Sequence, residues 1–138
     1  MRTKSILAGV AATIIGILLA QSDADYQNWM KTVAATNQSL QKNLAAKNAE
    51  GISADATKLQ ETFKQVEVFW QTRNSSDATS LAKQAQTVAA SISKDAASGN
   101  MDQAAADAKS LAAACGACHM AHREKGDSGF KIKEPKYQ

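Results

Sequence analysis

The chain has 138 residues, a length typical of one domain, and a formal net charge of +3 at neutral pH. Two basic residues, Arg2 and Lys4, lie at the very start; without them, 14 basic side chains oppose 13 acidic ones. Because the remaining charges are balanced and mixed along the sequence rather than gathered in a stripe, we expect no nucleic-acid partner.

Residues 1–20 have the pattern of a secretory signal peptide. Arg2 and Lys4 precede an apolar run over residues 6–20, and a polar segment follows. We expect cleavage after Ala20 or, alternatively, after Ala24. At 15 residues the apolar run is short for a full membrane span. A removed leader is therefore favoured over an anchor, and no membrane is expected as a partner after cleavage.

Residues 25–125 read as four helices. The segment has no proline and is rich in helix-forming residues, and its sparse helix breakers at Gly51, at residues 74–76 and at residues 99–100 divide it into four parts. Each part between breakers carries its own row of apolar residues at helical spacing. The rows are Tyr26, Met30, Val33, Leu40 and Leu44; Leu59, Phe63, Val66 and Trp70; Leu81, Ala85, Val88 and Ile92; and Met101, Ala104, Ala108, Leu111, Ala112, Cys115, Cys118 or His119, and His122. The sequence predicts an all-α domain, an antiparallel up-down-up-down four-helix bundle.

The helix boundaries carry capping residues. Ser53 and Ser76 are predicted N-caps, Gly99 suits a left-handed residue at a helix end, and Asn100 is predicted to cap the last helix. Residues 126–138 contain glycine, lysine and proline, and we expect an irregular, exposed C-terminal tail.

Residues 115–119 read Cys-Gly-Ala-Cys-His and contain the only two cysteines of the chain. This is the attachment pattern of c-type haem, in which two thiols bond the haem vinyl groups and the histidine binds the iron. In a helix, Cys115, Cys118 and His119 share one face, so one porphyrin can meet all three. The sequence predicts one covalently attached haem c near the end of the last helix, with His119 as the proximal axial ligand.

Three other readings compete with haem attachment. A redox dithiol of the Cys-x-x-Cys type usually sits at a helix N-terminus after a strand, whereas this pair lies late in an all-α chain. A zinc site could use Cys115, Cys118, His119 and His122, but four donors on one side of one helix cannot surround a tetrahedral ion. A structural disulfide is the third reading. The haem interpretation is favoured over all three.

A motif of this kind that closes the last of four helices resembles the class II cytochromes c, the cytochrome c prime family. The matching residues are the motif itself, Arg123 after it, and the aromatic residues Phe69 and Trp70 late in the second helix. The resemblance implies a haem pocket that includes Trp70 and a contact between Arg123 and the haem edge or a propionate. The alternative for Arg123 is a solvated residue that complements the helix dipole. His122 departs from the family, which often has an aromatic residue there. Many members pair through their first two helices, so a homodimer is compatible with the resemblance.

The sixth ligand of the iron divides this family. One branch leaves the iron five-coordinate and binds nitric oxide or carbon monoxide; the other uses a methionine of the first helix and carries electrons. Met30 lies six residues into the expected first helix and His119 six residues from the expected end of the last, each about 9 Å along its axis. Met30 is therefore the predicted distal ligand, with core packing as the alternative. Trp29 could instead cover the distal side of the pocket.

These features together predict a periplasmic monohaem cytochrome that carries single electrons between redox partner proteins. We expect no enzyme, since no acid–base pair for catalysis is evident. The alternative function is a five-coordinate protein that binds nitric oxide or carbon monoxide.

Overall fold

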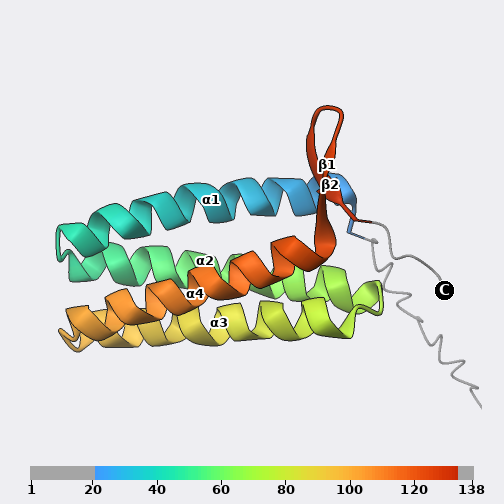
Figure 1. Ribbon diagram of the computed structural model, residues 1–138. Helices are drawn as coiled ribbons and strands as arrows, with labels where there is room; N and C mark the ends of the chain where they lie inside the picture. Colours follow the sequence, from blue (N-terminus) through green and yellow to red (C-terminus); the bar gives the residue numbers. More distant parts are fainter. Residues whose placement is uncertain (1–20, 134–138) are drawn as a thin grey trace, which may run out of the picture.

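The computed structural model describes residues 21–133. They form four helices followed by a two-stranded hairpin. The elements are α1 (Asp23–Ala45), α2 (Ala49–Thr72), α3 (Ser76–Ala97), α4 (Met101–His122), β1 (Arg123–Gly126) and β2 (Gly129–Ile132). Successive helices run in opposite directions and pack side by side, which confirms the predicted up-down-up-down bundle (Figure 1). The predicted signal peptide and residues 134–138 of the predicted tail lie outside the described residues.

The first helix begins with a capping box. The Ser22 hydroxyl accepts a hydrogen bond from the Asp25 N–H (3.1 Å), and the Asp25 carboxylate accepts one from the Ser22 N–H (2.9 Å). Two otherwise unpaired N–H groups of the helix start are satisfied in this way. Helix α1 therefore begins two residues earlier than the predicted domain boundary at residue 25.

The turn between α1 and α2 differs from its prediction. The chain turns at Lys47, with a φ of 52°, and Asn48 caps α2 by accepting from the Gly51 N–H (3.2 Å). Ser53, the predicted N-cap, lies inside the helix. Gly51 serves close packing instead, since a Cβ there would lie 2.5 Å from the Asn43 side chain. Asn43 itself is held by the Asp55 carboxylate at 2.7 Å. The glycine marks a close helix approach rather than a break.

The two later turns lie near their predicted places. Ser75 holds the N-cap position of α3, one residue before the predicted N-cap Ser76. Gly99 has a φ of 78°, which confirms the predicted left-handed residue at the end of α3. Asn100 holds the N-cap position of α4, although its side chain makes no capping hydrogen bond.

Small side chains dominate the core on α3 and α4. The buried residues of these helices are Ala78, Ala82, Ala85, Ala89, Ile92 and Ala96 on α3, and Ala104, Ala108, Leu111 and Ala114 on α4. Alanine allows helix axes to approach closely, and α4 accordingly packs mainly on α3. Helix α1 packs mainly on α2 and makes few contacts with α4, so the side of the bundle between α1 and α4 is the least closed (Figure 1).

The predicted tail begins differently from expectation. Helix α4 ends at His122, where Arg123 turns into extended backbone, and residues 123–132 form an antiparallel hairpin. The prediction of irregular chain is therefore wrong for residues 126–132. Gly129, with a φ of 135°, closes a tight turn between short strands, and Phe130 and Ile132 are residues that favour strands.

The apolar side of α2 should carry much of the stability. Leu59 is fully buried, and Leu59→Ala is expected to lower the free energy of unfolding by about 2–5 kcal/mol because it leaves a cavity. Val68 lies on the outer side of the same helix, and Val68→Ala should change that energy by less than about 0.5 kcal/mol. Urea denaturation followed by circular dichroism measures both. Equal effects of the two substitutions would contradict the burial of this face.

Candidate functional site

Helix α4 continues without a break through the Cys-Gly-Ala-Cys-His segment and ends three residues after it. Cys115, Cys118 and His119 are all half-buried, and Cys115 packs against the core cluster. On a regular helix these positions share one side, so the structure brings the three predicted side chains together on a partly buried face. Met120, the neighbour of His119, points away and is 81% exposed.

Both cysteines are free thiols in an environment that keeps them protonated. Burial raises the pKa of Cys115. Burial, followed by the proximity of Cys115 and Asp77, raises the pKa of Cys118 to about 11. A redox dithiol needs the opposite, a lowered pKa that yields a thiolate. The electrostatics of the site therefore disfavour the redox reading.

His119 and His122 have different surroundings. Burial, followed by the positive charge of Arg123, lowers the pKa of His119, so its imidazole is neutral and carries a free lone pair at neutral pH. His122 is held at 2.8 Å by the Asp77 carboxylate at the start of α3. Within residues 21–133 no group of three or more His, Cys, Asp or Glu side chains is placed to hold a metal ion. The four-donor zinc arrangement is therefore not assembled.

Four of the seven aromatic residues of the chain gather beside this face. Tyr26 and Trp29 come from the first turns of α1, and Phe69 and Trp70 from the last turns of α2. The Tyr26 ring lies 4.5 Å from Phe69 and 5.5 Å from Trp70, and Trp29 lies 6.3 Å from Phe69, all between ring centroids. We call these four residues the aromatic cluster. The start of α1 and the end of α2 meet at the same end of the bundle as the end of α4 (Figure 1).

Trp70 connects the aromatic cluster to α4. Its side chain is buried, and its ring lies 4.9 Å from the imidazole of His122. The Trp70 N–H lies near enough to Tyr26 to act on the pKa of that phenol, but it makes no hydrogen bond of acceptable geometry. A buried donor without an acceptor costs about 1–3 kcal/mol. The position therefore suits a bound group that presents an acceptor atom.

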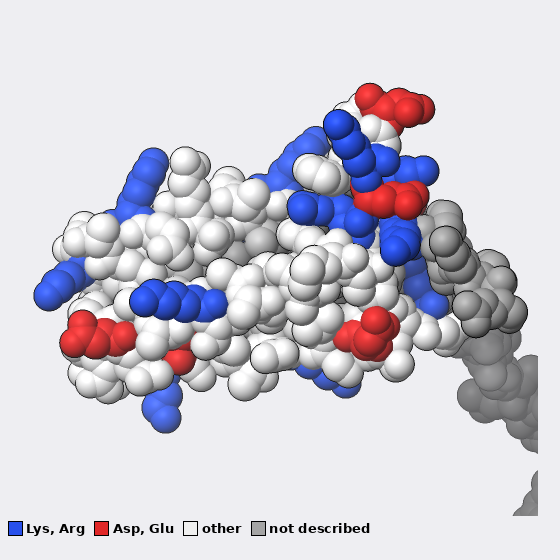
Figure 2. All heavy atoms as spheres, in the orientation of Figure 1, with Lys and Arg blue, Asp and Glu red and all other residues white. Residues whose placement is uncertain are grey.

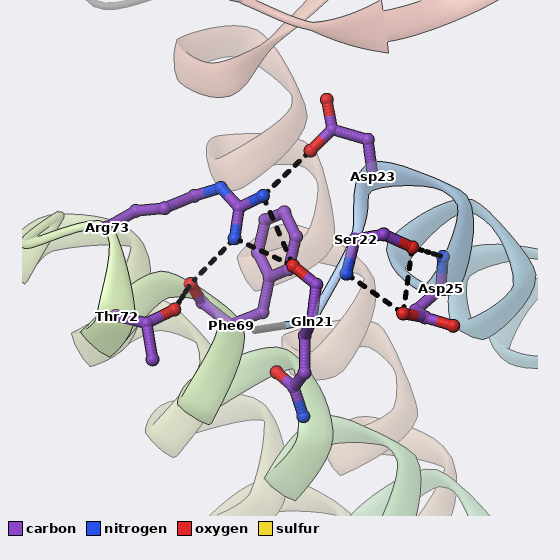
Figure 3. Close-up of polar contacts among 7 residues, drawn as sticks. All are labelled: Gln21, Ser22, Asp23, Asp25, Phe69, Thr72 and Arg73. Carbon is purple, nitrogen blue, oxygen red and sulfur yellow. Dashed lines mark hydrogen bonds and ion pairs between the residues drawn. The ribbon is translucent and has the colours of Figure 1, made fainter. Parts of the chain in front are cut away.

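Polar contacts of Arg73 lie beside Phe69 of the aromatic cluster (Figure 3). The Arg73 guanidinium lies 3.5 Å from the centroid of Phe69, pairs with the Asp23 carboxylate at 2.8 Å and reaches the Gln21 carbonyl at 3.4 Å. The start of α1 is thereby tied to the end of α2 across the cluster. Sequence reasoning missed this role of Arg73.

The levels of Met30 and His119 differ from the prediction. Helix α1 begins at Asp23 and α4 ends at His122, so Met30 lies about 10 Å from its helix end and His119 about 5 Å from its own. Tyr26, three residues into α1, is the residue level with His119. Helical side chains lean toward the N-terminus of their own helix, and in antiparallel helices this lean reduces the axial offset between Met30 and His119. Met30 and Trp29 are both partly buried and pack against the core.

Arg123 lies just beyond α4 rather than on its last turn. The residue is exposed, and its guanidinium lies 4.0 Å from the centroid of Phe130 in the hairpin. It is near enough to lower the pKa of His119. The predicted contact between Arg123 and a haem propionate stays a prediction.

Comparison with known proteins gives no relative: no protein-family model, no curated protein and no solved structure matches the chain. Within residues 21–133, none of the helices combines the length and the apolar character needed to cross a membrane.

Tyr26 offers a titration that reports on the aromatic cluster. Burial, followed by the proximity of Cys118, raises the pKa of its phenol from 10.0 to about 12. Between pH 10 and about 12, the folded protein therefore keeps the phenol proton that the unfolded chain releases. This difference contributes about 3 kcal/mol to the free energy of unfolding. The contribution is fully present below pH 10 and is lost as the pH rises to about 12.

The ultraviolet absorbance of tyrosinate, taken as the difference between the wild type and Tyr26→Phe, measures this pKa. We expect a midpoint near 12 for Tyr26. A midpoint near 10 would mean that the phenol is open to water and that the cluster does not close over it.

Proposed function

We propose that this chain is a periplasmic monohaem c-type cytochrome of class II that carries single electrons. Cys115 and Cys118 would attach the haem through thioether bonds, His119 would bind the iron on the proximal side, and Met30 is the proposed distal ligand. The haem supplies an iron that alternates between two oxidation states by gain or loss of one electron.

The placement of the donor set is the observation that carries this proposal. Two protonated thiols and a neutral imidazole lie on one half-buried face of α4, beside four aromatic rings. The buried N–H of Trp70 lies at the same end of the bundle, beside the Tyr26 phenol. The side between α1 and α4 is the least closed part of the bundle, and it lies next to this face. These residues fit a covalent haem better than a dithiol or a zinc ion.

The side chains around the site have defined tasks in electron transfer. His119 holds a lone pair ready because burial and Arg123 keep it neutral. Tyr26, Phe69 and Trp70 exclude water from the end of the bundle. A thioether ligand from Met30 would raise the reduction potential, and a rigid, apolar setting keeps the two oxidation states similar in geometry.

The proposed periplasmic location is supported by the leader predicted over residues 1–20, and it agrees with the attachment of c-type haem outside the cytoplasm. Contacts of the following residues favour cleavage after Ala20. Ser22 caps α1, Asp23 pairs with Arg73, and the Gln21 carbonyl accepts from Arg73 (Figure 3). Cleavage after Ala24 would remove all of these contacts.

The visible spectrum of the purified holoprotein tests the function and the ligand together. We expect a six-coordinate, low-spin spectrum that carbon monoxide does not change, because Met30 occupies the distal position. Met30→Ala should open that position and give a high-spin spectrum that shifts when carbon monoxide is added.

Met120→Ala is the matched control, since Met120 is exposed on the outer side of α4, and its spectrum should equal that of the wild type. A high-spin, gas-sensitive wild type that Met30→Ala leaves unchanged would reject Met30 as a ligand and support the gas-binding alternative. A protein without haem bands would reject the proposed function.

The mature N-terminus is a separate prediction. Mass spectrometry of the protein recovered from the periplasm should find Gln21 as the first residue. A variant that begins at residue 25 should be less stable by about 1–2 kcal/mol, because it lacks the helix cap and an exposed ion pair. A natural start at residue 25, or a shortened variant of unchanged stability, would contradict the importance of these contacts.

A further inference from the structure

The segment after α4 is a regular two-stranded hairpin rather than an irregular tail. It stands out from the bundle directly beyond the end of α4 (Figure 1). Two contacts fix its base: the Lys133 N–H donates to the His122 carbonyl at 2.8 Å, and Ile132 packs against the core. A four-helix bundle is complete without such an element, so the hairpin calls for a role of its own.

The hairpin carries a charge opposite to that of the bundle. Residues 21–122 contain nine basic and ten acidic side chains, whereas residues 123–133 contain four basic and two acidic ones. Figure 2 shows Lys and Arg gathered around the hairpin, while most of the surface over α4 is uncharged. The positive charge of the described chain is therefore concentrated beside the site.

The strand register divides these charges between two faces. Arg123, Lys125 and Phe130 lie on one face of the hairpin, together with Ile132 at its base. Glu124 and Lys131 lie on the other and form an ion pair at 3.2 Å. The first face thus carries two positive charges and no acidic residue of either strand. We call Arg123, Lys125 and Phe130 the basic face.

Phe130 adds an apolar anchor to the basic face. Its ring is 61% exposed, although a large apolar side chain usually gains from burial. The Arg123 guanidinium, 4.0 Å from the ring centroid, holds it in place by a cation–π contact. An ordered aromatic ring next to arginine is the composition found at the centres of protein interfaces.

We propose that the basic face is the docking surface for a partner protein with an acidic surface. Binding needs only the hairpin, but the identification of this partner as the electron donor or acceptor rests on the proposed function. The hairpin begins four residues after His119, so a protein bound there lies next to the proposed haem. Opposite charges would speed the encounter, and Phe130 would fix the position of the bound partner.

A protein partner fits these observations better than an anionic lipid surface. Segments that bind lipid headgroups carry clusters of about four to eight basic residues, each contributing about 1 kcal/mol. The basic face has two basic residues and one ring that arginine already covers on one side. This is too little charge and too little apolar surface to hold a protein on a membrane.

The test uses flavodoxin, an acidic one-electron carrier, as the probe for the mature holoprotein. Stopped-flow absorbance gives the rate constant for reduction of the haem by reduced flavodoxin at several salt concentrations. Lys125→Glu should lower this rate constant about tenfold at low salt and reduce its dependence on salt. Lys58→Glu is the matched control: it makes the same charge change on α2, far along the bundle, and should alter the rate less than twofold.

Calorimetric titration with oxidised flavodoxin measures binding without electron transfer. Phe130→Ala should weaken binding severalfold and leave its salt dependence unchanged, because the ring acts at short range. Equal behaviour of Lys125→Glu and Lys58→Glu in a haem-containing protein would overturn the docking surface and leave the proposed function standing. If the protein lacks haem but binds flavodoxin, and Lys125→Glu weakens that binding, the docking surface would stand and the proposed function would be rejected. Binding to phosphatidylglycerol vesicles without binding to flavodoxin would also overturn the proposal.

Discussion

The packing of α4 on α3 fixes the direction of the two thiols and the imidazole of the site. Ala104, Ala108, Leu111 and Ala114 form the buried row of α4 and hold the helix close to its neighbour. Each residue turns a helix by about 100°, so a slip of one residue would turn both thiols and the imidazole away from the aromatic cluster. Most positions in this row tolerate only small residues, because a larger side chain would push α3 and α4 apart.

The distribution of large side chains complements this alanine packing. Close packing of α3 and α4 leaves little room for rings along the bundle, and four of the seven aromatic residues gather at the end where α1 begins and α2 ends. The bundle therefore has a tightly packed body and an aromatic end. The half-buried face of α4 adjoins that end, which is where a flat, apolar group such as a haem would meet rings rather than solvent.

The polar contacts at the aromatic end of the bundle fix the orientation of the His122 and Arg73 side chains. Asp77 holds His122, and Asp23 holds Arg73 over Phe69. Both carboxylates are exposed and add little stability by themselves. Asp77 gives His122 a fixed partner and Asp23 gives one to Arg73, while the side chain of His119 has no hydrogen bond among the described residues.

The helices could be predicted from the sequence because apolar spacing and breakers act locally. The alternating direction of the helices in the bundle is as predicted. Leu40, Leu59 and Ile92 of the predicted rows are fully buried, whereas Met30, Val33, Leu44 and Val88 are partly buried. The missed features depend on tertiary contacts. Gly51 read as a break, but its role comes from the Asn43 side chain on another helix. The hairpin was missed because strands of four residues give a weak pattern.

The aromatic cluster was only partly predictable. Trp29 and Trp70 were expected near the site, and Tyr26 was assigned only to an apolar row. The signal was present in the sequence: rings in the first turns of one helix and the last turns of the next must meet in an antiparallel bundle. The predicted level of His119 relative to Met30 is wrong because the end of α4 depends on the start of the hairpin, which local patterns do not reveal.

The attachment of a porphyrin to α4 is the central claim of this account. Its most direct test is the intact mass of the mature protein, made in cells that contain the cytochrome c maturation machinery and measured after denaturation. The mass should be increased by one haem, with the added mass located on a peptide that contains Cys115 and Cys118. An unmodified mass, with both thiols free to react with an alkylating reagent, would contradict it.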